Sequence, residues 1–165
     1  MIWFAACVTL PGCAGRSDVG AGYVDIPAVT AIVAVGDIPV VTVRPGESSD
    51  VAIPIVVAPG YHVQSNPAGN EFLVPLELHL DDAAGVRFGR ADYPAASPYR
   101  LEGTDEDLMT YHGSVFVKLR VTALASASVG EEKITGSLRY QACDPRRCLF
   151  PSSVPVAFRI VVREP

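Results

Sequence analysis

Apolar and polar residues alternate along several segments of this 165-residue chain. Leu76, Leu78 and Leu80 fall on one face of an extended segment, and the apolar positions between Val115 and Val121 do the same. Alternation with a period of two predicts half-buried antiparallel strands. We therefore expect strands over the segments 39–44, 50–57, 61–65, 72–80, 115–123, 133–141 and 154–163.

Turn-forming residues separate these segments. Pro45-Gly46 and Pro59-Gly60 are typical of tight turns, and no window of helical length shows a 3.6-residue period. About seven short strands with regular turns predict an all-β fold, namely a single-domain immunoglobulin-like β-sandwich. The interval from Val86 to Tyr111 fits this pattern poorly, so we expect a long loop over one end of the sandwich.

The composition agrees with a globular β protein. Hydrophobic residues make up 49% of the chain, and its 14 prolines and 14 glycines are spread along it rather than clustered. Eighteen acidic residues against thirteen basic ones give a net charge of −5, with no basic stripe. Nucleic acid is therefore not an expected partner, because phosphate binding requires clustered Lys and Arg.

The first twelve residues are apolar and uncharged. They are too few to span a bilayer, which takes about 20 residues, and they resemble the apolar core of a signal peptide. The run from Leu10 to Cys13 resembles a bacterial lipobox, whose cysteine becomes lipidated. We expect a signal-peptide-like segment over 1–12, a tether and lead-in over 13–36, and the folded domain over 37–165. Lipidation of Cys13 and an ordinary signal peptide stay open as alternatives.

Cys143 and Cys148 lie five positions apart at the end of a predicted strand. Two thiols this close should pair in an oxidising compartment. So small a ring contributes only roughly 2–3 kcal/mol by chain entropy, less than a long-range bridge, which favours a redox role. Arg146 and Arg147 lie within the ring and favour a thiolate, whereas Asp144 opposes it.

Two other interpretations of the cysteine pair remain open at this point. The disulfide could be purely structural in a non-enzymatic immunoglobulin-like interaction module. A metal site is disfavoured, because two cysteines without a second Cys or His pair make a poor zinc site. His62, His79 and His112 lie far apart in the sequence, so we expect neither a metal nor another cofactor.

The cysteine block carries a family resemblance. The run from Leu138 to Pro151, LRYQACDPRRCLFP, closely resembles the signature of the N-terminal periplasmic domain of the thiol:disulfide interchange protein DsbD family. The run from Gly60 to Pro67, together with residues 72–75, is similar to the same family about 80 residues upstream. The resemblance covers roughly residues 40–162.

This resemblance implies a sandwich with one redox-active disulfide near its end. Cys143 and Cys148 match the redox pair, and Tyr140 matches an aromatic residue beside it. The family shields its disulfide with a mobile cap loop that carries an aromatic residue. The long loop is the place for such a cap, with Tyr99 or Tyr93 as the candidate that covers the disulfide.

The resemblance also implies an activity and partners. The domain would act as a protein-disulfide reductase or interchange component, taking electrons from a thioredoxin-like donor and passing them to oxidised exported clients. We expect it in the periplasm or at the outer surface of the cell envelope, with a lipid anchor at Cys13 as one option. The chain shows no segment like the family's membrane domain or C-terminal thioredoxin-like domain, so we expect a stand-alone domain with a separate donor.

Overall fold

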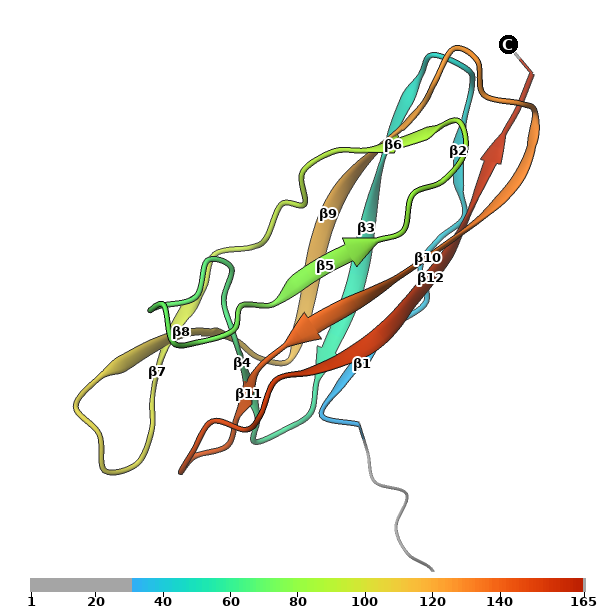
Figure 1. Ribbon diagram of the computed structural model, residues 1–165. Coiled ribbons are helices and arrows are strands. Elements are labelled where there is room, and N and C mark those ends of the chain that lie inside the picture. The colour runs from blue at the N-terminus through green and yellow to red at the C-terminus, as the bar shows by residue number, and fades with distance from the viewer. Residues whose placement is uncertain (1–30, 165) are drawn as a thin grey trace, which may run out of the picture.

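The computed structural model describes residues 31–164 (Figure 1). The signal-peptide-like segment, Cys13 and the expected tether up to residue 30 lie outside the described residues. Within them the chain forms these strands: β1 (Val33–Val35), β2 (Val41–Val43), β3 (Ser48–Val57), β4 (His62–Gln64), β5 (Glu77–Leu80), β6 (Val86–Phe88), β7 (Ser97–Arg100), β8 (Asp107–Tyr111), β9 (Ser114–Ala123), β10 (Gly130–Tyr140), β11 (Ala142–Cys143) and β12 (Ser152–Val162). No part of 31–164 forms a helix long and apolar enough to cross a membrane.

The strands form three four-stranded sheets. Their orders are β1-β3-β9-β6, β2-β12-β10-β5 and β11-β4-β8-β7, and all pairings are antiparallel except that of β2 with β12. The first two sheets contribute their inward side chains to one hydrophobic core. The fold is therefore an all-β, immunoglobulin-like β-sandwich, as the alternation predicted.

Strand β9 shows why the alternation was informative. Val115, Val117, Leu119 and Val121 are buried, whereas the side chains between them are exposed. Facing residues of β3 are buried in the same register, such as Ile53 opposite Val117. Burying an aliphatic side chain of this size contributes roughly 1.5–3 kcal/mol, so one inward row supplies much of the stability.

The interval from Val86 to Tyr111 is not one long loop, so that expectation was wrong. It holds β6 at the edge of the first sheet and the hairpin of β7 and β8, which belongs to the third sheet. These strands are short, and β7 lies at a sheet edge and carries Pro98, so no apolar alternation marked it. Figure 1 shows β4, β7, β8 and β11 gathered at one end of the elongated molecule.

Two other boundaries differ from the expected ones. β1 lies inside the segment expected as tether and lead-in, and its fully buried Val33 pairs with Val57 of β3. The strand expected over 72–80 forms only from Glu77 onward. Before it, the Asn70 side chain accepts a hydrogen bond from the Phe72 backbone N–H (3.0 Å), which bends the chain into a turn.

Candidate functional site

The two cysteines form a disulfide at the end of the third sheet. Cys143 ends β11, which pairs with β4 so that Cys143 lies opposite His62. Cys143 is fully buried, whereas Cys148 is only half-buried in the loop that follows. The two residues joined by this bond therefore differ in their access to solvent.

Asp144 organises the loop between the cysteines. Its Oδ1 accepts hydrogen bonds from the backbone N–H groups of Arg146 (2.8 Å) and Arg147 (2.9 Å). These bonds hold the pKa of the Asp144 carboxyl below its usual range, with a further contribution from the two arginine charges. Asp followed by Pro145 is a typical start for such a side-chain-capped turn.

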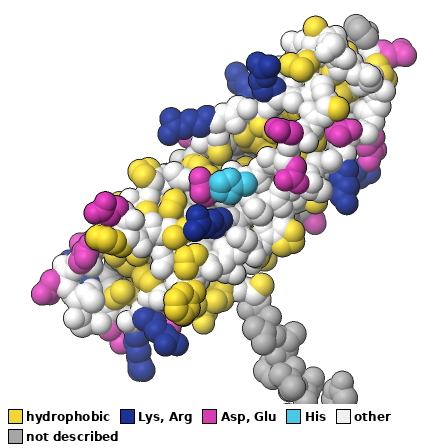
Figure 2. Space-filling model, viewed as in Figure 1, with side chains coloured by type: hydrophobic (Ala, Val, Ile, Leu, Met, Phe, Trp, Pro, Cys, Tyr) yellow, Lys and Arg dark blue, Asp and Glu magenta, His cyan; other side chains and the backbone are white. Residues whose placement is uncertain are grey.

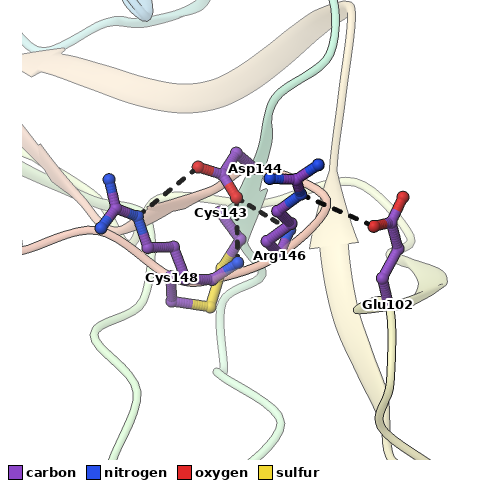
Figure 3. A network of polar contacts seen from close by, with 6 residues as sticks. Glu102, Cys143, Asp144, Arg146 and Cys148 are labelled. Carbon is purple, nitrogen blue, oxygen red and sulfur yellow. Dashed lines mark hydrogen bonds and ion pairs between the residues drawn. A yellow bond between two sulfur atoms is a disulfide. The ribbon is translucent and has the colours of Figure 1, made fainter.

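The arginine side chains of this loop face carboxylates. Arg146 Nε lies 3.8 Å from Glu102 and Arg147 Nε lies 3.8 Å from Asp144, and both arginine side chains are largely exposed (Figure 3). Exposed pairs of this kind are screened by water and contribute little stability. The acidic partners offset the cationic environment that we expected to favour a thiolate.

Gln64 contacts the disulfide directly, and the sequence analysis missed it. Its Nε2 donates to Cys143 Sγ (3.1 Å) and lies 3.7 Å from Cys148 Sγ, and the residue is fully buried. It lies inside the block from Gly60 to Pro67 that resembles the DsbD family. Its polar side chain at the end of a short strand was the available signal, but nothing in the sequence said which strand would lie beside it.

An aromatic stack lies next to this contact. The ring of His62 stacks on Tyr99 of β7 with centroids 3.6 Å apart and an interplanar angle of 16°. His62 Nδ1 also lies 3.3 Å from Thr110 Oγ1. Burial, and then the nearby His112, lower the pKa of His62. The imidazole is thus held in its neutral form against the phenol ring.

Strand register explains why these side chains meet. Directly opposed residues of an antiparallel pair share a face, and so do residues two apart on one strand. Cys143 opposes His62. Gln64 lies two residues after His62 on β4 and opposes Thr110 of β8. Thr110 in turn opposes Ser97 of β7, and Tyr99 lies two residues after Ser97. One face of the third sheet therefore carries the buried sulfur, the amide, the imidazole and the phenol.

The two edges of this sheet also meet. β11 and β7 are its outermost strands, yet the turn after β7 touches the disulfide loop, because the Glu102 backbone N–H donates to the Pro145 carbonyl at 2.8 Å. Strands lie about 4.8 Å apart, so a flat four-stranded sheet could not close this contact. The sheet curls, so that the tip of the β7–β8 hairpin lies against the disulfide loop.

The remaining predicted residues take other places. Tyr140 ends β10 with its side chain in the hydrophobic core. Tyr93 precedes the hairpin, and its hydroxyl accepts a hydrogen bond from the Leu78 backbone N–H (2.9 Å). Burial raises the pKa of Tyr93. Of the two tyrosines considered for the cap, the structure brings Tyr99 to the disulfide face and ties Tyr93 to β5.

A metal site would need several ligating side chains close together. Between residues 31 and 164, no group of three or more His, Cys, Asp or Glu side chains is arranged to hold a metal ion. His62 and His112 come nearest to a pair, with ring centroids 5.1 Å apart.

Solved structures give weak similarity. The N-terminal periplasmic domain of ScsB from Proteus mirabilis superposes with a TM-score of 0.50 at 12% identity, over 76% of this chain and 44% of that one. This chain therefore spans less than half of the ScsB chain. The reduced Neisseria meningitidis DsbD n-terminal domain gives a TM-score of 0.46 at 16% identity, over 78% of this chain and 90% of that one. No curated protein matches the sequence.

The family comparison is more extensive. The family described as "Thiol:disulfide interchange protein DsbD, N-terminal" matches residues 30–158. That span contains the cysteine pair, Gln64 and the β7–β8 hairpin, so it includes the whole disulfide end of the sandwich. This chain belongs to the family of the DsbD N-terminal domain, a thiol–disulfide exchange family.

Proposed function

We propose that the Cys143–Cys148 disulfide relays electrons from a thioredoxin-like donor to oxidised client proteins. The observation that carries this proposal is the unequal burial of the two cysteines. Cys143 is fully buried beside an amide donor, whereas Cys148 is half-buried. One sulfur is thus open to attack, and the other is placed to leave as a stabilised thiolate.

The exchange proceeds in two steps. A donor thiolate attacks Cys148 Sγ, the bond between the two cysteines breaks, and Cys143 leaves as a thiolate. The second donor thiol loses its proton and attacks the donor sulfur of the mixed disulfide, which releases Cys148. The donor dithiol has lost two electrons and two protons, and both cysteines are thiols. The same steps in reverse reduce an oxidised client.

The β7–β8 hairpin would act as a cap that regulates access to the disulfide. The β7–β8 hairpin is held to the disulfide loop by one backbone hydrogen bond and by an exposed ion pair between Arg146 and Glu102, and its Tyr99 stacks on His62 of β4. An exposed ion pair contributes about 0–1 kcal/mol, so these contacts are weak enough for a docking partner to displace. Closed, the cap limits attack by stray thiols.

We place the domain in the periplasm, with the apolar N-terminal segment as its export signal and Cys13 as a lipid anchor. Periplasmic location follows the family, and the lipobox-like run from Leu10 to Cys13 motivates the anchor. Expression of the full chain with labelled fatty acid tests it. Label on the wild type and none on Cys13→Ser supports the anchor, and an unlabelled wild type contradicts it.

Trapping tests the electron relay. In a Cys143→Ala variant, Cys148 keeps its thiol but Cys143 can no longer displace a client from it, so mixed disulfides with clients should accumulate; donors should accumulate when their own second cysteine is also replaced. The matched control is Cys148→Ala, whose remaining sulfur is buried and should trap far less. Thioredoxin-like proteins among the captured species support the relay. If the variant captures no thiol protein, the relay is contradicted and the disulfide has a structural role.

A further inference from the structure

One polar atom in the disulfide site has no hydrogen-bond partner among the residues that the structure describes. Gln64 is fully buried, and its Nε2 faces the two sulfurs, but its Oε1 makes no hydrogen bond with any described residue. A buried carbonyl without a donor carries the full cost of its desolvation. An apolar side chain of the same length would avoid that cost in the oxidised protein. The position therefore needs an explanation other than stability of the oxidised fold.

The chemistry of the neighbouring sulfur supplies this explanation. A disulfide sulfur is a weak acceptor and has no proton to donate. Reduction turns Cys143 into a thiolate, which accepts hydrogen bonds strongly, or into a thiol, which can donate one. A primary amide carries both a donor and an acceptor, so it can serve either form of the cysteine. An amide thus interacts better with reduced Cys143 than with the disulfide.

Geometry allows both interactions. Nε2 already lies 3.1 Å from Cys143 Sγ, which suits a leaving thiolate. The terminal torsion of a glutamine side chain has a broad, roughly two-fold energy profile. Half a turn about it exchanges Nε2 for Oε1, and Oε1 then faces the Cys143 thiol. The rest of the buried side chain stays in place.

We infer that Gln64 is a catalytic residue of the exchange that favours the reduced cysteine pair over the disulfide. Its Nε2 donates to the Cys143 thiolate as that sulfur leaves, and its Oε1 accepts from the Cys143 thiol once the proton has arrived. The inference rests on the proposed function, because it assumes that Cys148 is the sulfur attacked. It adds a residue that acts on the leaving sulfur and that lies 79 positions away in the sequence.

Gln64→Met tests this inference. Methionine keeps the length of the side chain but removes both the donor and the acceptor. The oxidised variant should be at least as resistant to unfolding as the wild type, because the unpaired carbonyl is gone. Its reduction by dithiothreitol should nevertheless slow roughly ten- to hundredfold, as expected for losing a hydrogen bond to a charged group. Its exchange equilibrium with glutathione should shift toward the disulfide.

A second readout follows the leaving sulfur itself. In a Cys148→Ser background, Cys143 is the remaining thiol of the pair, and its thiolate absorbance can be titrated. Gln64→Met should raise the pKa of Cys143 by about one pH unit or more, which corresponds to a tenfold loss of thiolate stabilisation. Gln64→Glu, which has no donor and adds a negative charge, should raise it further and slow reduction more.

Gln141→Met is the matched control. Gln141 is a second glutamine near the disulfide, half-buried rather than fully buried, and its amide bonds the Val74 backbone N–H (2.8 Å) and the Leu149 carbonyl (3.0 Å) rather than a sulfur. This variant should unfold more easily and leave the pKa of Cys143 unchanged. Gln64→Met is expected to raise the pKa of Cys143 without destabilising the fold, whereas Gln141→Met is expected to destabilise the fold without changing that pKa. This difference separates a role in the exchange from a role in packing.

The outcomes for Gln64 and for the relay are distinguishable, because dithiothreitol needs no docking surface. Slow reduction and a raised Cys143 pKa in Gln64→Met support the inference even where trapping finds no partner. Successful trapping together with a wild-type reduction rate and an unchanged Cys143 pKa overturns it and leaves the relay standing. A Gln64→Met protein that unfolds more easily and reacts faster also overturns it, since Gln64 would then be a packing residue.

Discussion

His62 and Tyr99 stack with their ring centroids 3.6 Å apart, although β8 lies between their strands in the sheet. Two strand spacings would separate residues on β4 and β7 by about 10 Å in a flat sheet. The rings meet because the sheet curls toward the face that carries Cys143. The stack is therefore one of the contacts that hold the β7–β8 hairpin against the disulfide face.

Removing the Tyr99 ring should open the cap. Aromatic pairs contribute about 0.5–1.5 kcal/mol, so Tyr99→Ala should raise the rate at which dithiothreitol reduces the disulfide by roughly two- to tenfold. Stopped-flow reduction under identical thiol concentration and pH measures the effect. Tyr99→Phe keeps the ring and should react like the wild type. Equal rates for the alanine variant and the wild type would show that the stack does not control access.

The backbone contact from Glu102 to Pro145 can be tested without disturbing the turn. Thr104 N–H bonds the Leu101 carbonyl (3.2 Å), and Gly103 has a φ of 79°, as in a type II turn, which accepts proline at its second position. Glu102→Pro keeps this turn but deletes the backbone N–H that bonds Pro145. Dithiothreitol should therefore reduce the disulfide severalfold faster than in the wild type.

Glu102→Ala separates the backbone contact from the ion pair. It removes only the carboxylate that faces Arg146, an exposed pair worth about 0–1 kcal/mol, and should change the rate little. Hydrogen exchange of the hairpin amides reports the same opening. If the alanine and proline variants react alike, the backbone bond does not hold the cap.

Acid should weaken the third sheet through His62. Burial and the neighbouring His112 lower the pKa of His62 below its ordinary value of 6.5. The folded protein favours the neutral imidazole. The contribution of His62 to the free energy of unfolding is therefore complete above pH 6.5 and is lost as the pH falls from there through the folded pKa. Unfolding free energies at about pH 7.5 and 5.5 should therefore differ more for the wild type than for His62→Phe. Identical pH dependence in both proteins would contradict a role for this imidazole.

Exposed phenylalanines near the disulfide should serve partner recognition. Phe150 is 96% exposed and lies two residues after Cys148, and Phe72 is 85% exposed. Gln141 links their two segments by bonding Val74 and Leu149. Figure 2 shows hydrophobic side chains gathered on this end of the visible face. Large exposed apolar groups of this kind mark interaction surfaces.

Phe150→Ser should therefore slow exchange with a protein donor severalfold and leave reduction by dithiothreitol unchanged. Stability should stay within about 0.5 kcal/mol, because an exposed ring loses little burial. The matched control is Phe116→Ser on the outer face of β9, where the ring is 53% exposed. A donor rate that falls equally in both variants would argue against a specific docking role for Phe150.

The residue pattern alone predicted the long sandwich strands and the cysteine pair. Val115, Val117 and Leu119 alternate with polar residues, and only an extended strand with one buried face satisfies that pattern. Cys143 and Cys148 are so close in the chain that any local turn brings their sulfurs together. The matching residues around them also identified the family, because that comparison needs no coordinates.

Long-range strand pairing, which the residue pattern does not reveal, sets which side chains surround the disulfide. A period of two assigns each residue to a face, but it does not say which strand will lie alongside. Gln64 and Tyr99 reach Cys143 and His62 through the register of four short strands and the curl of their sheet. That register depends on long-range backbone pairing, which leaves no periodic trace in β7 or β11 because strands of four and two residues are too short to show one.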